Sequence, residues 1–186
     1  MSEVVDFLMF LDKNEARMRY EATVRVYERR YSDIQAAKIK EVLKRLKGAS
    51  FGLVLDVGCG PGLLLPFLPD CEVVCLDFSL GMLEVIREKK FPCFLVLGDS
   101  DWLPLRDSVF DGVFSFTVLQ NLPDPLASLR EMSRVVKKDG KVVVTVLKKR
   151  LDGEELKKVC LEAGLSVLDV FPASVEDVCA ICVKKS

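Results

Sequence analysis

The sequence predicts an α/β fold: a doubly wound, mostly parallel sheet of seven strands with helices on both faces, closed by an antiparallel C-terminal hairpin. Three observations lead to this prediction. Apolar runs alternate with helical patterns from residue 53 to residue 147, an order typical of parallel strands joined by right-handed crossovers. The first run breaks into a glycine-rich loop, as it does in nucleotide-binding sheets. The last two runs lie seven residues apart, too few for a parallel crossover, so they are expected to form a hairpin.

The N-terminal segment is predicted to be helical and basic. Residues 3–12 show apolar positions at helical spacing, and a second helix is expected from Ser32 or Asp33, as its N-cap, to Gly48. Residues 13–47 contain eleven Lys and Arg against five Asp and Glu, a net charge of +6, whereas residues 48–186 carry −4. This surplus is either a solvated helix face or a surface that faces a substrate.

The rest of the chain alternates strands and helices. Strands are expected over five apolar runs: residues 53–57, 72–76, 93–97, 109–116 and 141–147. The third strand, residues 93–97, is expected to be buried. Helices are expected over four segments: residues 63–68, 79–90, 125–136 and 152–163. Ser79 is the predicted N-cap of the second helix, Gly164 ends the fourth, and residues 138–140 are expected to form a turn. The hairpin strands are residues 165–170 and 178–183.

The glycine-rich loop follows the first strand, in the stretch LVLDVGCGPG that ends at Gly62. Glycine suits a place where the backbone turns sharply and a ligand approaches closely. Nineteen residues after Gly58 the second apolar run ends at Asp77, where an acidic side chain can accept bonds from both hydroxyls of a ribose. A dinucleotide fingerprint has glycine or alanine at its sixth position, where this chain has Leu63, so the loop fits a dinucleotide poorly.

The loop resembles motif I of the class I S-adenosylmethionine-dependent methyltransferases, D-x-G-x-G-x-G, to which Asp56, Gly58, Gly60 and Gly62 correspond. Three further stretches are similar to the methyltransferase type 11-like branch that includes the ubiquinone and menaquinone biosynthesis enzymes. They are GDSDWLPL at 98–105, FDGVFSFTVLQNLPDP at 110–125 and LREMSRVVKKDGKVVVTV at 129–146. A Rossmann-like sheet closed by an antiparallel hairpin is the arrangement of that class.

The resemblance implies S-adenosyl-L-methionine as the cofactor. Asp56 and the Gly58–Gly62 loop would hold its methionine end, Asp77 its ribose, and Phe78 its adenine face. Asp99 would face the adenine amino group, the Ser100 amide would meet a ring nitrogen, and Ser115 would line the methyl-donor end. The expected cofactor-binding residues are therefore Asp56, Gly58, Cys59, Gly60, Gly62, Asp77, Phe78, Asp99, Ser100 and Ser115. Carboxylates that close apolar strands cost stability unless exposed or paired, so three at equivalent strand ends independently indicate a site.

The expected chemistry is in-line displacement at the sulfonium methyl, for which the protein mainly supplies alignment. The chain contains no histidine, so a general base, if one is needed, must be Asp, Glu or Tyr, and no catalytic residue is assigned. The chain also lacks an N/D-P-P-Y/F tetrapeptide after the fourth strand, which disfavours methylation of exocyclic adenine amines or of glutamine. Candidates for contact with the acceptor are Tyr20, Tyr27, Gln120 and Asn121.

Composition and cysteine placement bound the class of protein. The seven cysteines are odd in number and mostly lie in apolar runs, which favours buried, reduced thiols. Cys179 and Cys182 form a C-x-x-C pair, but on a strand they would point to opposite faces, so we expect no metal site. The opening residues do not resemble a signal peptide, and no apolar run approaches the ~20 residues of a membrane span. We therefore expect a soluble, cytoplasmic protein.

We expect one methyltransferase domain over residues 1–186, with an N-terminal helical cap (1–47) and a cofactor-binding sheet core (48–186). The segments after the fourth and fifth strands are short, so the cap, an activating partner subunit or a large substrate must complete the pocket. RNA or protein is therefore the favoured acceptor, ahead of a small metabolite, and the basic segment is expected to serve the substrate and not the cofactor. The alternatives are a non-catalytic cofactor-binding module and an NAD-type oxidoreductase, which Leu63 and the hairpin disfavour.

Overall fold

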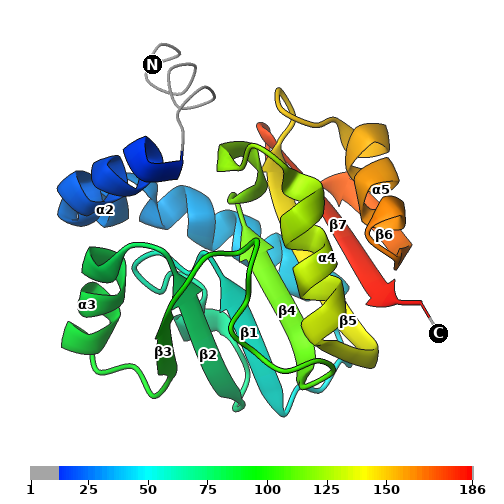
Figure 1. The fold of residues 1–186 in the computed structure, drawn as a ribbon, viewed down its shortest axis with the longest axis horizontal. Coiled ribbons are helices and arrows are strands. Elements are labelled where there is room, and N and C mark those ends of the chain that lie inside the picture. The colour runs from blue at the N-terminus through cyan, green and yellow to red at the C-terminus, as the bar shows by residue number, and fades with distance from the viewer. Residues whose placement is uncertain (1–12, 186) are drawn as a thin grey trace.

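The computed structural model describes residues 13–185, and the helix expected over residues 3–12 lies outside them. Helices and strands alternate over most of the described chain, except that no helix separates the third strand from the fourth or the sixth from the seventh (Figure 1). The elements, in chain order, are α2 (Lys13–Arg45), β1 (Leu53–Val57), the 3₁₀ turn η1 (Leu65–Phe67), β2 (Glu72–Asp77), α3 (Leu80–Glu88), β3 (Phe94–Leu97), β4 (Phe110–Phe116), the 3₁₀ turn η2 (Leu119–Asn121), α4 (Pro125–Val135), β5 (Val136–Leu147), α5 (Gly153–Glu162), β6 (Leu165–Pro172) and β7 (Asp177–Lys184).

The strands form one seven-stranded sheet in the order β3-β2-β1-β4-β5-β7-β6. The five strands from β3 to β5 are parallel, and β7 runs antiparallel to both of its neighbours, β5 and β6. The predicted mostly parallel sheet and its closing hairpin are thus confirmed. The strand order reverses between β1 and β4, the place where open α/β sheets bind ligands at the carboxyl ends of their strands.

Each face of the sheet is covered by a different pair of helices. One apolar core joins α4 and α5, through residues such as Leu129 and Leu156, to one face of β1, β4 and β5. A second core joins α2 and α3, through Val42 and Ile86, to the opposite face. The predicted doubly wound architecture is confirmed, and α2 belongs to the layer that packs on the sheet (Figure 1).

The helix α2 is longer than predicted. Ser32 and Asp33 lie in its interior, so the prediction of an N-cap at either residue is wrong. No Gly or Pro occurs between residues 13 and 45, and nothing in the backbone therefore stops the helix. The helix ends at Arg45, and Gly48 follows with a φ of +86°, so the predicted glycine stop is confirmed.

The helix expected over residues 63–68 shrinks to the single turn Leu65–Phe67. Three prolines, at positions 61, 66 and 69, remove backbone donors from this short stretch, which prevents a regular helix. The other helices match their predictions within two residues at either end. Ser79 caps α3 by accepting a bond from Met82 N, and a reciprocal capping box between Asp152 and Glu155 opens α5.

Two strand predictions need correction. The strand β3 is not buried, because it lies at the edge of the sheet, where Phe94 and Leu97 are exposed; apolar content alone does not distinguish an edge strand from a central one. The turn expected at 138–140 lies within β5, which begins early because Val136 pairs with Phe110. Asp139 adopts a φ of +63° in that irregular stretch, so a local bend is present, but the strand continues through it.

Five of the seven cysteines are buried, and Cys71 and Cys93 are partly buried. All seven are free thiols, and Cys179 and Cys182 belong to the cores on opposite faces of the sheet. Among residues 13–185 no cluster of His, Cys, Asp and Glu side chains could hold a metal ion. The helices of the same range include none long and apolar enough to cross a membrane.

Candidate functional site

A pocket of about 710 Å³, open to solvent, lies at the carboxyl ends of β1, β2 and β4. Its walls come from the glycine-rich loop, from the end of β2, from residues 98–100 and from residues 116–122. Tyr20 of α2 adds a fifth wall. The pocket therefore lies where the sheet topology predicts a ligand.

The three glycines of the loop all have positive φ: +69° at Gly58, +53° at Gly60 and +79° at Gly62. A Cβ on Gly58 would lie 2.4 Å from Val118 Cγ2, and one on Gly62 would lie 2.9 Å from Leu65 Cδ1. A Cβ on Gly60 would meet nothing within 4 Å. Gly58 and Gly62 are thus needed for packing, whereas Gly60 presents bare backbone to open space.

Asp77 ties the end of β2 to the glycine-rich loop. Its Oδ2 accepts a bond from Gly60 N at 2.8 Å, and its Oδ1 accepts one from Ser79 N at 2.9 Å. Burial raises the pKa of this carboxyl to about 6, although the backbone N–H groups of Ser79 and Gly60 act in the opposite direction. Each carboxylate oxygen keeps a further lone pair for a ligand.

Asp56, near the end of β1, is almost completely buried, and none of the side chains that the structure describes forms a hydrogen bond or ion pair with its carboxylate. Burial, and then the negative charge of Asp77, raise the pKa of Asp56 to about 8. Asp56 and Cys59 line a smaller chamber of about 350 Å³, which shares Gly58 and Gly60 with the main pocket. Burial likewise raises the pKa of the Cys59 thiol.

The opposite wall of the main pocket is aromatic. The ring of Phe78 meets the ring of Tyr20 edge-on, with 5.9 Å between centroids. The Tyr20 hydroxyl accepts a bond from Asn121 Nδ2 at 3.0 Å, and burial raises its pKa to about 12. Asp99 and Ser100 complete this side, with Asp99 Oδ1 accepting a bond from Asp101 N. Two expected acceptor contacts, Tyr20 and Asn121, thus lie together at the pocket, whereas the side chain of Tyr27 lies outside the described part of the chain.

The structure gathers most of the expected cofactor-binding residues around one site. The main pocket is lined by six of them: Gly58, Gly60, Asp77, Phe78, Asp99 and Ser100. The smaller chamber adds Asp56 and Cys59. Gly62 and Ser115 line neither space: Gly62 packs against Leu65, and the buried Ser115 hydroxyl donates to Val57 O at 3.1 Å, which ties β4 to β1. These two residues therefore support the backbone around the site and do not line it themselves.

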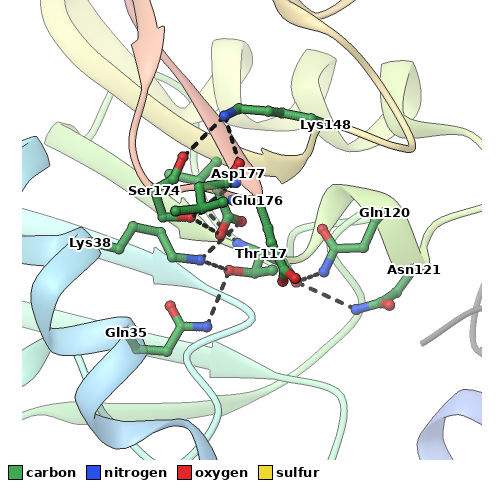
Figure 2. A network of polar contacts seen from close by, with 11 residues as sticks. Gln35, Lys38, Thr117, Gln120, Asn121, Lys148, Ser174, Glu176 and Asp177 are labelled. Carbon is green, nitrogen blue, oxygen red and sulfur yellow. Dashed lines mark hydrogen bonds and ion pairs between the residues drawn. The ribbon is translucent and has the colours of Figure 1, made fainter. Parts of the chain in front are cut away.

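A buried polar network beside the pocket was not expected from the sequence (Figure 2). Its centre is Thr117, which lines the pocket and has a φ of +61°, an unusual value for a β-branched residue. The Thr117 hydroxyl accepts bonds from Lys38 Nζ at 2.6 Å and from Gln35 Nε2 at 3.2 Å, and Gln120 Nε2 donates to Thr117 O. Lys38 also forms a buried ion pair with Asp177 at 3.0 Å. Lys38 lies in an ordinary helical pattern, so nothing local in the sequence indicates this role.

A doubly wound sheet with a glycine-rich loop after β1 and an acidic residue at the end of β2 defines a nucleotide-binding α/β domain. Residues 55–144 match the family model of the methyltransferase domain. This match supports a class I S-adenosylmethionine-dependent methyltransferase, and the fold around it is shared with solved methyltransferase structures.

Curated relatives agree with this assignment. A demethylmenaquinone methyltransferase of Renibacterium salmoninarum is 42% identical over 93 residues, which cover 49% of this chain and 39% of that protein. The Staphylococcus aureus enzyme of the same name is 37% identical over 140 residues, covering 71% and 52%. A malonyl-[acyl-carrier protein] O-methyltransferase of Salmonella typhimurium is 34% identical over 119 residues, covering 63% and 47%. The chain thus spans about half the length of the curated relatives it matches, or less.

Solved structures share the fold over nearly the whole chain. A methyltransferase in complex with the Haloferax volcanii Trm112 methyltransferase activator superposes with a TM-score of 0.79 at 20% identity, covering 90% of this chain and 98% of that one. Magnesium protoporphyrin IX methyltransferase from Synechocystis, solved with bound S-adenosylmethionine, gives 0.78 at 19% identity, covering 94% and 98%.

Proposed function

We propose that this protein transfers a methyl group from S-adenosyl-L-methionine to an acceptor. The observation that carries the proposal is the convergence of the glycine-rich loop, Asp77 and Asp56 around one pocket in a methyltransferase-family domain. A methyl-transfer assay with labelled cofactor on fractionated cell extract tests it. Absence of labelled product in every fraction, together with absence of cofactor binding by calorimetry, would refute it.

The site fits the cofactor on structural grounds. Asp56 is a buried carboxylate without a partner among the described side chains, so it is available to a ligand, and the open space beside Gly60 lets a ligand approach the backbone closely. The carboxylate of Asp77 would accept bonds from the ribose hydroxyls, and Phe78 would contact the adenine. Asp99 and Ser100 would meet the adenine edge, while Asp56 and Cys59 would hold the methionine end. When bound, this cofactor supplies a methyl group already activated for displacement.

The residues of the chain would contribute alignment and exclusion of water. Tyr20, with its pKa raised to about 12, stays protonated near neutral pH, so its role is to hold Asn121 and close the pocket, and a general-base role does not suit it. No acidic side chain is assigned as a base. An acceptor that is nucleophilic without losing a proton first would suit this site best.

A small metabolite is the acceptor that we now favour. Two curated relatives are named as demethylmenaquinone methyltransferases, and demethylmenaquinone is a small molecule. In addition, Tyr20 shows that α2 already supplies a wall of the pocket, which removes the argument that a large substrate must complete it. RNA or protein stays the alternative. Label recovered in an organic-solvent extract or in small water-soluble molecules would support the small acceptor, and label in precipitated RNA or protein would support the alternative.

An activating partner subunit is a second part of the proposal. One structural neighbour was solved with the Trm112 activator. In this chain the edge strand β3 pairs with β2 alone, and Phe94, Leu97 and Trp102 are 61%, 57% and 82% exposed there. An exposed apolar edge strand can accept a strand from another chain. Phe94→Lys should abolish co-purification with such a subunit and leave cofactor binding unchanged; retained co-purification would place the partner elsewhere.

Two sequence expectations stay predictions. The first is a division into an N-terminal cap, residues 1–47, and a sheet core, residues 48–186. The second is a cytoplasmic location, which cell fractionation would test.

A further inference from the structure

The smaller chamber beside the glycine-rich loop contains two buried hydrogen-bond acceptors that lack donors. Gln35 and Asp56 both line it, with 7% and 2% of their surfaces exposed. The amide oxygen of Gln35 has no hydrogen-bond partner, and no hydrogen bond from a described side chain offsets the burial that raises the pKa of Asp56. Buried acceptors of this kind cost stability until a donor reaches them. The chamber adjoins the main pocket, because Gly58, Gly60 and Phe116 line both spaces.

The side chain of Gln35 is held in place from its other end. Its Nε2 donates to Thr117 Oγ1 at 3.2 Å, and Thr117 Oγ1 also accepts a bond from Lys38 Nζ (Figure 2). Lys38 is in turn paired with Asp177 at 3.0 Å. The nitrogen of the Gln35 amide is therefore in use, and its oxygen is the atom left for a ligand.

The chemistry of the chamber selects a particular kind of ligand group. Both available groups, the Gln35 amide oxygen and the Asp56 carboxylate, can only accept when the carboxylate is ionised. Asp77 adds a second acidic group nearby, and the Lys38 ammonium is committed to Asp177 and Thr117. A cationic group with several N–H donors, such as a primary ammonium, satisfies both acceptors and supplies the missing positive charge.

We infer that Gln35 of α2, together with Asp56, binds the α-ammonium group at the methionine end of the cofactor. The inference rests on the proposed function, since it is that cofactor which carries such an ammonium. It assigns α2 to the cofactor site, whereas the sequence favoured a role for the N-terminal segment in substrate binding alone. Of the arginines in that segment, the side chains of Arg17, Arg19, Arg25 and Arg29 lie outside the described part of the chain.

The test compares ligands that differ only at the methionine end. S-adenosylhomocysteine carries the ammonium and the carboxylate, decarboxylated S-adenosylmethionine keeps the ammonium alone, and 5′-methylthioadenosine carries neither. Binding of each is measured by calorimetry to the wild-type chain, to Gln35→Met, which keeps the length of the side chain, and to Gln35→Glu, which keeps an acceptor. Ser128→Ala is the control, because the Ser128 hydroxyl is also buried without a hydrogen-bond partner, but Ser128 lines neither the chamber nor the main pocket.

Gln35→Met should weaken binding of the two ammonium-bearing ligands by about tenfold, the effect of losing one hydrogen bond to a charged group, and should change 5′-methylthioadenosine binding less than about twofold. Gln35→Glu should restore most of the loss, and Ser128→Ala should leave all three affinities unchanged. Equal weakening of all three ligands by Gln35→Met, or no weakening, would overturn the inference. If the wild-type chain binds none of the ligands, the proposed function fails instead, so the two failures are distinguishable. Thermal unfolding of each variant confirms that it is folded.

Discussion

Replacement of Asp56 by Asn should remove a large part of the pH dependence of stability in the ligand-free protein. The buried carboxyl has its pKa raised from 3.8 to about 8, chiefly by burial. A group whose folded pKa is raised contributes its stability at low pH and loses it as the pH rises toward the folded value. The wild-type chain should therefore become less stable between about pH 5 and about pH 7.5, and Asp56→Asn, which cannot ionise, should lose much less.

The size of the effect follows from the two pKa values. Asp56 is ionised in the unfolded chain across that interval but stays protonated in the folded protein, and at 1.36 kcal/mol per unit this lowers the unfolding free energy of the wild-type protein by about 3 kcal/mol. For a chain of this length each kcal/mol moves the melting temperature by roughly 2–4 °C, so the wild-type midpoint should fall by roughly 6–12 °C. Asp77, with its pKa raised to about 6, titrates in the same interval and in the same direction, so the difference between the two proteins isolates Asp56.

Thermal unfolding by circular dichroism across this pH range is the assay. Asp70→Asn is the control, because Asp70 is an exposed carboxylate in the loop before β2. It should follow the wild-type curve. If Asp56→Asn loses stability in parallel with the wild-type protein, then Asp56 is not an uncompensated buried acid, and the reasoning about the chamber fails with it.

Three further predictions concern binding and packing. Asp77→Ala should weaken S-adenosylhomocysteine binding by at least about tenfold in calorimetry, because charged hydrogen bonds are lost, while Asp70→Ala should not; a loss of twofold or less in a folded variant would place the ribose elsewhere. NAD should bind at least about tenfold more weakly than S-adenosylhomocysteine, since Leu63 breaks the dinucleotide spacing, and comparable affinities would contradict the methyltransferase assignment. Lys38→Met should destabilise the protein by about 3–5 kcal/mol in urea unfolding because it leaves Asp177 buried without a counter-ion, and adding Asp177→Leu should recover most of the loss; additive losses would show that the ion pair is not coupled.

The parts of the fold that were predicted correctly depend on residues that are close together in the sequence. The strand before the glycine-rich loop, the Ser79 cap and the seven-residue link between the last strands each depend on neighbouring residues. The same is true of the site, since the glycines and Asp77 occupy fixed positions relative to β1 and β2.

What the sequence missed depends on partners that are distant along the chain. The exposure of Phe94 depends on which strand ends the sheet, and apolar runs carry no such information. The burial of Lys38 depends on Asp177 and Thr117, 139 and 79 residues away. A lysine in an amphipathic helix is usually solvated, so this role becomes visible only when the hairpin and α2 are placed together. The positive φ of Thr117 has the same origin, because its hydroxyl is held by Lys38 and Gln35, and both belong to α2.

The ion pair between Lys38 and Asp177 also determines at which point of its synthesis the protein can complete its folding. A ribosome adds about 5–20 residues per second, so Asp177 follows Lys38 by roughly 7–28 s. During that interval Asp177 has not been made, so burial of Lys38 would leave its ammonium without a counter-ion. The half of α2 that carries Gln35 therefore cannot dock on the sheet. The strands around the glycine-rich loop can pair earlier. The nascent chain should therefore pass through a stage with a partly formed sheet and an open pocket, and become competent to bind its ligand only when β7 has been made.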